Sequence, residues 1–205
     1  MLTAPEALLR LREGNRRFVA SASAPRADHA RRAALVGGQE PFAIVLGCSD
    51  SRVPAELVFD QGFGDLFVIR VAGNIVAPSQ VGSVEYAAAR FGTRLVVVLG
   101  HTQCGALLAT LEALTGPATP QSRNLLSIVN RIRPSVEPLL EGGLAGDRAA
   151  LLARAVRANV RASADHLRHG SELLEQLSAS DGLLVVGAEY SLDTGVVDFF
   201  DGADG

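Results

Sequence analysis

Two cysteines and one histidine stand out as side chains that can bind a metal ion. Cys48 closely follows the apolar run at residues 42–46, and His101 and Cys104 closely follow the apolar run at residues 95–99. Thiolates and imidazole suit zinc, and three protein ligands leave a fourth position open for water, as in catalytic zinc sites. Taken one at a time, the same residues also fit small buried side chains and a hydrogen-bonded core histidine. Their types and spacing alone leave both interpretations open.

A disulfide and thiol redox chemistry fit these cysteines less well. The first fifteen residues alternate leucine with charged residues and lack the continuous apolar core of a secretory signal, so we expect a cytoplasmic protein. Thiols stay reduced in that compartment, which argues against a structural disulfide between Cys48 and Cys104. The two cysteines also lack the C-x-x-C spacing that thiol redox proteins commonly use. Metal binding is the better interpretation.

Composition excludes some kinds of partner. The formal net charge is −3, whereas a surface that binds nucleic acid needs clustered cations that make the balance basic. No apolar run approaches the roughly 20 residues that a membrane helix requires. We therefore expect neither nucleic acid nor a membrane as a partner. The length of 205 residues, 48% of them hydrophobic, is sufficient for one buried core.

Short apolar runs predict the strands that position the three candidate ligands. Four continuous, often β-branched runs predict buried parallel strands at residues 42–46, 66–71, 95–99 and 183–186, and a fifth strand at 196–200 is expected to lie antiparallel at an edge. Helices are predicted at residues 79–90, 104–114 and 147–168, the last with Gly170 as its C′ residue. This alternation predicts a single α/β domain over residues 39–205, with a mostly parallel central sheet flanked by helices.

Residues 1–38 are expected to form an N-terminal helical arm and a linker. Thr3 and Glu6 have the spacing of a capping box, which predicts a helix that ends near Val19. Residues 20–32 are rich in Ala, Ser, Pro and Arg without an apolar period, which is typical of a linker.

Convergence of Cys48, His101 and Cys104 is the central structural prediction. In an open parallel sheet, ligands bind outside the carboxyl ends of the strands. Since each of the three residues follows a predicted parallel strand, we expect their side chains to meet at that edge of the sheet. Cys104 would also lie at the N-terminus of a helix, where the helix dipole favours a thiolate.

Two motifs resemble the paired signature of β-class carbonic anhydrases: CSDSR at 48–52 and HTQCG at 101–105. The resemblance extends through FVIRVAGN at 67–74, GSVEYA at 82–87 and VVGAEYSLDTG at 185–195. It implies reversible hydration of carbon dioxide to bicarbonate and a proton by zinc-bound hydroxide. One Zn²⁺ per subunit would be held by Cys48, His101 and Cys104. It also implies a homodimer, or a homotetramer built from dimers, because the N-terminal helix resembles the arm that family members lay over a partner subunit.

The resemblance further implies roles around the metal. Asp50 and Arg52 match the catalytic dyad, in which the guanidinium holds the carboxylate and the carboxylate accepts a hydrogen bond from the hydroxide. An arbitrary Asp-x-Arg is more often an exposed ion pair that contributes little. The resemblance also implies substrate-binding positions, contributed in part across a dimer interface: Gln39, Phe67, Tyr86 and Gly105. It further implies two positions that support the ligands, Arg70 and Ser49. For Phe67, plain core packing is an equally good interpretation.

Two other functions stay compatible with the same residues. Related enzymes hydrolyse carbon disulfide or carbonyl sulfide with the same zinc ligands. A non-catalytic zinc-binding protein would also keep Cys48, His101 and Cys104. The presence of both Asp50 and Arg52 favours an active enzyme, a zinc-dependent lyase.

Overall fold

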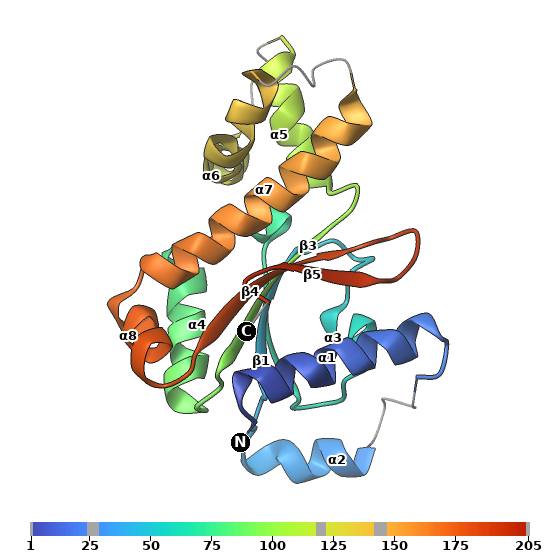
Figure 1. Ribbon diagram of the computed structural model, residues 1–205, viewed down its shortest axis with the longest axis vertical. Coiled ribbons are helices and arrows are strands. Elements are labelled where there is room, and N and C mark those ends of the chain that lie inside the picture. The colour runs from blue at the N-terminus through green and yellow to red at the C-terminus, as the bar shows by residue number, and fades with distance from the viewer. Residues whose placement is uncertain (1, 24–28, 118–121, 142–146, 204–205) are drawn as a thin grey trace.

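Five strands form one sheet in the computed structural model, which describes residues 2–23, 29–117, 122–141 and 147–203 (Figure 1). The strands follow the order β2-β1-β3-β4-β5, and only β5 runs antiparallel to its neighbour. They are β1 (Ala43–Gly47), β2 (Leu66–Arg70), β3 (Leu95–His101), β4 (Leu184–Tyr190) and β5 (Val197–Asp201). This confirms the predicted α/β fold with four parallel strands and an antiparallel edge strand.

Helices cover both faces of the sheet, which explains the continuous apolar runs of its strands. One face, which includes Val45 and Val97, packs against α1 (Ala4–Val19) and α3 (Ala55–Val58). The other face, which includes Ile44 and Val96, packs against α4 (Pro78–Arg90), α7 (Arg148–His169) and α8 (Glu172–Ser180). Every residue of β1 and β3 is buried. The centre of the sheet is therefore held firmly from both sides.

A third group of buried side chains lies beyond the carboxyl ends of the strands. It is formed by α5 (Gly105–Thr115), α6 (Arg123–Glu141), part of α7 and the short turn η2 (Ala72–Asn74), and it includes Cys48 and Cys104. In Figure 1, α7 crosses the sheet and continues to α5 and α6. One long helix thus contacts both the sheet and the end of the molecule that carries the cysteines.

The predicted helices occur as α1, α4, α5 and α7, with bounds that differ from the predictions by about a residue. Thr3 and Glu6 form the predicted capping box, in which the Thr3 backbone N–H donates to Glu6 Oε2 at 2.8 Å. Gly170 follows α7 directly, at the C-cap position, with a φ of −107°. The predicted linker is not wholly irregular, because it contains the short helix α2 (His29–Ala34), and η1 (Leu35–Gly37) follows it; residues 24–28 lie outside the described residues.

The side chain of Asn15 attaches α1 to the rest of the domain. Its Nδ2 donates to the carbonyls of Val58 at 3.1 Å and Gly195 at 2.9 Å, and its Oδ1 accepts from the N–H of Val197 at 2.9 Å. Asn15 is buried. In this chain α1 therefore packs on its own sheet.

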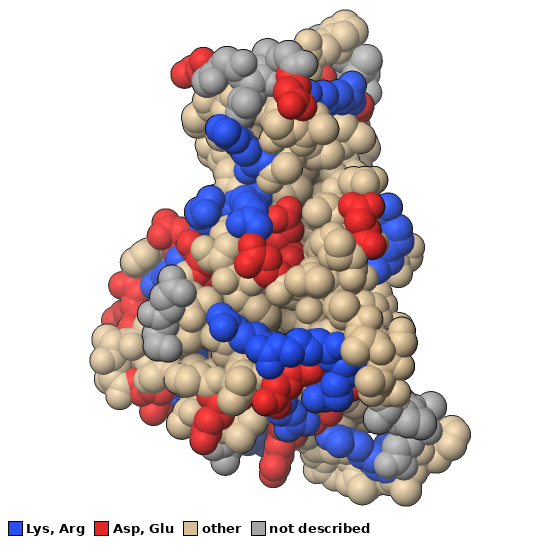
Figure 2. Space-filling view, turned by 45° about the vertical axis from the view of Figure 1, so that its right-hand side comes forward, with Lys and Arg blue, Asp and Glu red and all other residues tan. Residues whose placement is uncertain are grey.

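Arginine and acidic side chains lie side by side on the face shown in Figure 2. Across the described residues, arginine and acidic side chains form ion pairs, such as Arg10 with Asp65 at 2.9 Å and Arg168 with Asp201 at 2.7 Å. Among the described residues, none of the helices is long and apolar enough to cross a membrane.

Candidate metal centre

The structure brings Cys48, His101 and Cys104 together at the carboxyl ends of two adjacent strands. Cys48 directly follows β1, His101 is the last residue of β3, and Cys104 is the N-cap of α5. The parallel pairing of Gly47 with Leu99 places the two strand ends next to each other. The potential ligand atoms of the three residues all lie within 4.8 Å of one another.

The distance between the two sulfurs fits a shared zinc ion. Cys48 Sγ and Cys104 Sγ lie 4.0 Å apart, and both residues are buried. Two thiolates on a tetrahedral zinc, each about 2.3 Å from the metal, lie about 3.8 Å apart. A disulfide would need about 2.05 Å. The pair is therefore spaced as two ligands of one cation.

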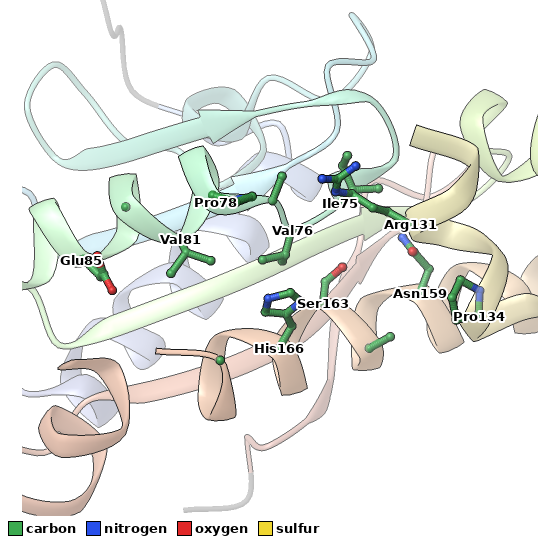
Figure 3. Close-up of a pocket in the computed structure, with 14 residues that line it drawn as sticks. Ile75, Val76, Pro78, Val81, Glu85, Arg131, Pro134, Asn159, Ser163 and His166 are labelled. Atoms are coloured by element: carbon green, nitrogen blue, oxygen red, sulfur yellow. The ribbon is translucent and has the colours of Figure 1, made fainter. Parts of the chain in front are cut away.

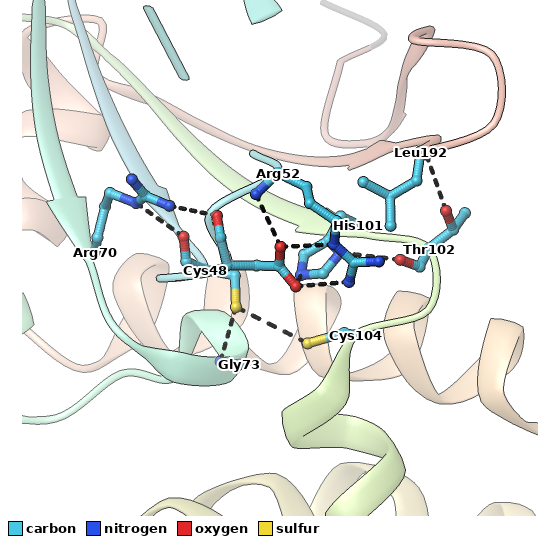
Figure 4. A network of polar contacts seen from close by, with 9 residues as sticks. Cys48, Arg52, Arg70, Gly73, His101, Thr102, Cys104 and Leu192 are labelled. Carbon is cyan, nitrogen blue, oxygen red and sulfur yellow. Dashed lines mark hydrogen bonds and ion pairs between the residues drawn. The ribbon is translucent and has the colours of Figure 1, made fainter. Parts of the chain in front are cut away.

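His101 presents one ring nitrogen to the two sulfurs. Its Nδ1 lies 2.9 Å from the carbonyl oxygen of Thr102, so Nδ1 carries the proton and donates it in a hydrogen bond (Figure 4). Its Nε2 is buried and has no hydrogen-bond partner among the described residues. A buried nitrogen without a partner is costly unless something binds it. The donor set thus fits a zinc ion.

The two cysteine sulfurs shift each other's pKa in opposite directions. The Cys48 sulfur accepts hydrogen bonds from the Cys104 thiol and from the backbone N–H of Gly73, and the surroundings of the sulfur lower the pKa of Cys48 to about 4, with the bond from Cys104 as the largest cause. The same bond with Cys48, together with burial, raises the pKa of Cys104. A cation that bound both sulfurs would displace the remaining proton.

Asp50 lies beside the ligands and is held by Arg52. Its Oδ1 accepts from the Arg52 backbone N–H at 3.0 Å and from Nε at 2.9 Å, and its Oδ2 accepts from Nη2 at 2.7 Å. The guanidinium holds the pKa of Asp50 well below its usual range, and the carboxylate in turn raises the pKa of Arg52. Asp50 Oδ2 is 3.8 Å from His101 Nε2. An ionised carboxylate therefore borders the space in front of the candidate ligands.

Arg70, at the end of β2, holds the backbone that carries Cys48 and Asp50. Its Nε donates to the Cys48 carbonyl at 3.0 Å and its Nη2 donates to the Asp50 carbonyl at 2.5 Å (Figure 4). Ser49, between these two residues, is exposed. Gly105 is the first residue of α5, directly after Cys104, and is also exposed.

A family model described as carbonic anhydrase matches residues 43–197. The chain belongs to the carbonic anhydrase family. This confirms the resemblance carried by the two motifs, and it gives the chain the function of the family, the interconversion of carbon dioxide and bicarbonate. The matches do not favour sulfur-compound hydrolysis or a non-catalytic role.

Relatives of known identity match most of the chain. Carbonic anhydrase 2 from Mycobacterium tuberculosis is 39% identical over 190 residues, which cover 90% of this chain and 87% of the relative. The crystal structure of the β-carbonic anhydrase CafA of Aspergillus fumigatus is 26% identical, with a TM-score of 0.77, over 93% of this chain and 89% of that chain. A β-carbonic anhydrase from Sordaria macrospora, described as tetrameric, is 25% identical, with a TM-score of 0.74, over 82% and 85%.

Three expected substrate-binding residues of this carbonic anhydrase lie away from the cysteines of the same chain. Phe67 pairs with Ile44 near the start of β1, whereas Cys48 follows the end of that strand. Tyr86 is 55% exposed on α4, and its ring centroid is 6.2 Å from that of Phe67. Gln39 is exposed in the segment that precedes β1. A single chain therefore does not place these side chains beside the candidate ligands.

Sequence reasoning gave no role to Asn159 and expected of Gly73 only that it lets the backbone approach closely around the pocket. The backbone N–H of Gly73 donates to Cys48 Sγ at 3.3 Å, and Asn159 Nδ2 donates to the Gly73 carbonyl at 2.8 Å. For Gly73 the available signal was a glycine just after a strand. For Asn159 the signal was a polar residue on the apolar face of a predicted helix. Neither signal points by itself to a metal centre.

Proposed function

We propose that this carbonic anhydrase hydrates carbon dioxide at one zinc ion per chain, held by Cys48, His101 and Cys104. The observation that carries the proposal is the buried, unpartnered Nε2 of His101, which faces two sulfurs spaced 4.0 Å apart. When bound, the zinc ion would supply a Lewis acid that makes a water molecule at its open position more acidic.

Asp50 and Arg52 are the catalytic pair in this proposal. Because the Asp50 carboxylate stays ionised, it only accepts hydrogen bonds and can hold the attacking water in one orientation. Arg52 keeps its charge at neutral pH and fixes both carboxylate oxygens. A carboxylate with so low a pKa is a poor carrier of the product proton. Asp50 therefore orients the nucleophile, and the proton leaves to solvent.

Arg70 stabilises the loop that carries Cys48 and Asp50. By donating to two carbonyls of the loop after β1, it fixes the backbone from which Cys48 and Asp50 project. A guanidinium beside the site also offsets negative charge, because two thiolates and a carboxylate outweigh the charge of one divalent cation.

We propose that a second copy of the chain completes the substrate pocket with Gln39, Phe67 and Tyr86. Gln39 and Tyr86 are exposed, and Phe67 lies beside the start of β1 whereas Cys48 follows its end, which supports an intermolecular contribution. The Sordaria relative is described as tetrameric. A dimer or a tetramer is expected in light scattering of the purified chain. A monomer at working concentration would remove this part of the proposal. Reduced thiols at Cys48 and Cys104 fit the cytoplasmic location that we also propose.

The test of the catalytic proposal is Asp50→Asn. We expect a turnover about 10-fold or more below wild type in stopped-flow hydration of carbon dioxide, with one zinc per chain retained. Asp193→Asn, at an exposed position in the turn before β5, is the matched control and should keep both values. Equal loss of zinc and activity in Asp50→Asn would make Asp50 a structural residue. A wild-type protein that binds no zinc would contradict the proposed function itself.

A further inference from the structure

Two buried polar side chains interrupt the apolar face of α7. Asn159 and Ser163 lie one helical turn apart and are 2% and 6% exposed, among apolar neighbours such as Val156 and Val160. In Figure 3 they project from α7 toward the segment that carries Ile75, across the floor of a cavity of about 750 Å³. Buried polar groups persist in folded proteins when they form hydrogen bonds, so their partners matter.

Both side chains donate to consecutive carbonyls of η2. Asn159 Nδ2 donates to the Gly73 carbonyl at 2.8 Å, and Ser163 Oγ donates to the Asn74 carbonyl at 3.0 Å. Gly73 has a φ of +70° and Asn74 a φ of +43°, so this backbone is in the left-handed region at two successive residues. Such a conformation needs support from its surroundings. The two hydrogen bonds from α7 supply it.

The other side of the same turn faces the metal centre. The Gly73 N–H donates to Cys48 Sγ at 3.3 Å (Figure 4). A side chain at position 73 would place its Cβ 2.9 Å from Ile132 Cδ1 and 3.1 Å from Ala106 Cβ, so α5 and α6 also close on this residue. The direction of the N–H is thus set by neighbours on every side, and Asn159 holds the carbonyl of the same residue.

We propose that Asn159 is a positioning residue of the metal centre, which acts through Gly73 on the sulfur of Cys48. The inference rests on the proposed function in that Cys48 is a zinc ligand. A hydrogen bond to a thiolate draws electron density from the sulfur and fixes its direction, and partners of this kind tune both metal affinity and the acidity of bound water. Ser163 has a smaller effect, because the N–H of Asn74 donates to the Val71 carbonyl and not to a ligand.

The test compares three variants of the full-length protein. Asn159→Leu keeps the size of the side chain and removes its hydrogen bond to the Gly73 carbonyl. Ser163→Ala removes the hydrogen bond to the Asn74 carbonyl. Val160→Ala is the control, because Val160 lies on the same helix but packs on Gly100 and Gly187 and not on η2. The readouts are the rate of zinc transfer to a chromogenic chelator and the thiolate-to-metal charge-transfer band of the Co²⁺-substituted protein. We expect zinc release about 10-fold faster in Asn159→Leu, with a shifted band. Ser163→Ala should change less, and Val160→Ala should match wild type.

Several results would overturn the proposal. The first is an Asn159→Leu variant that releases zinc at the wild-type rate and keeps the wild-type charge-transfer band. The second is a Val160→Ala or Ser163→Ala variant whose release rate and band change as much as those of Asn159→Leu. If Asn159→Leu does not fold, Asn159→Ala takes its place under the same criteria. A wild-type protein that binds cobalt through thiolate, while the Asn159 variant is indistinguishable from it, refutes this inference alone. A wild-type protein that binds neither metal refutes the proposed function as well.

Discussion

Replacement of Asn15 by alanine should destabilise the protein by about 2.5 kcal/mol. The substitution removes the partner of the buried Val58 carbonyl in α3, of the partly buried Gly195 carbonyl in the turn before β5 and of the buried Val197 N–H at the start of β5. Each such group costs about 1–3 kcal/mol. We take the low end, because a cavity of about 280 Å³ borders Asn15 and admits water to part of this region. The higher helix propensity of alanine offsets about 0.5 kcal/mol.

Urea unfolding of the metal-free protein, followed by far-ultraviolet circular dichroism, measures this loss without a contribution from metal binding. The same loss corresponds to a fall of about 5–10 °C in the melting temperature. Asn124→Ala, at an exposed position on α6, is the control and should stay within about 0.5 kcal/mol of wild type. If Asn15→Ala were as stable as Asn124→Ala, the three hydrogen bonds would not hold α1 to the sheet in solution, and the reasoning would be refuted.

Two further predictions concern Gly73 and Cys48. Gly73→Ala places a Cβ in a crowded position at a positive φ and should cost about 2 kcal/mol or more, whereas Gly82→Ala in α4, where a Cβ meets open space, should be neutral or slightly stabilising in thermal denaturation. Because the pKa of Cys48 falls from 9.0 to about 4 in the metal-free fold, ionised Cys48 adds stability that is fully present above pH 9 and is lost as the pH falls toward 4. The stability difference between wild type and Cys48→Ser should therefore widen from pH 5 to pH 8, and a constant difference would contradict the assigned hydrogen bonds.

The inner strands β1, β3 and β4 were predictable because they are buried on both faces, although β3 and β4 extend further than expected. In the sequence, the apolar runs stop before Gly100 and Gly187. In the structure, β3 continues to His101 and β4 continues to Tyr190. At both glycines a Cβ would lie within 3 Å of Val160 side-chain atoms. These glycines make room for α7, and an apolar pattern cannot distinguish that role from the end of a strand.

α6 was not predicted because it contains Pro134 and Pro138, residues that normally break a helix. Its buried residues, Val129, Ile132 and Val136, nevertheless keep helical spacing. Packing against α5 and α7 outweighs the cost of the two prolines. Local propensity alone gives the wrong answer in such a segment.

The candidate site was predictable where short motifs carry it, because both motifs follow predicted parallel strands whose carboxyl ends meet at one edge of the sheet. Cys48, Asp50 and Arg52 stand within five residues, so one motif reveals them. Asn159 reaches the same site from a distant helix through the backbone of Gly73. A hydrogen bond to a carbonyl places no constraint on the type of residue that carries it, so sequence reasoning had no pattern to detect.

The register of β1 with β3 makes the metal centre a late product of folding. Cys48 and His101 become neighbours only when β1 and β3 pair, and β2 and α4 lie between these two strands in the sequence. Pairing between strands so distant along the chain is slow compared with the formation of helices. A nascent or partly unfolded chain therefore offers a metal ion the local pair His101 and Cys104 without Cys48, and uptake at all three ligands during refolding reports the pairing of β1 with β3.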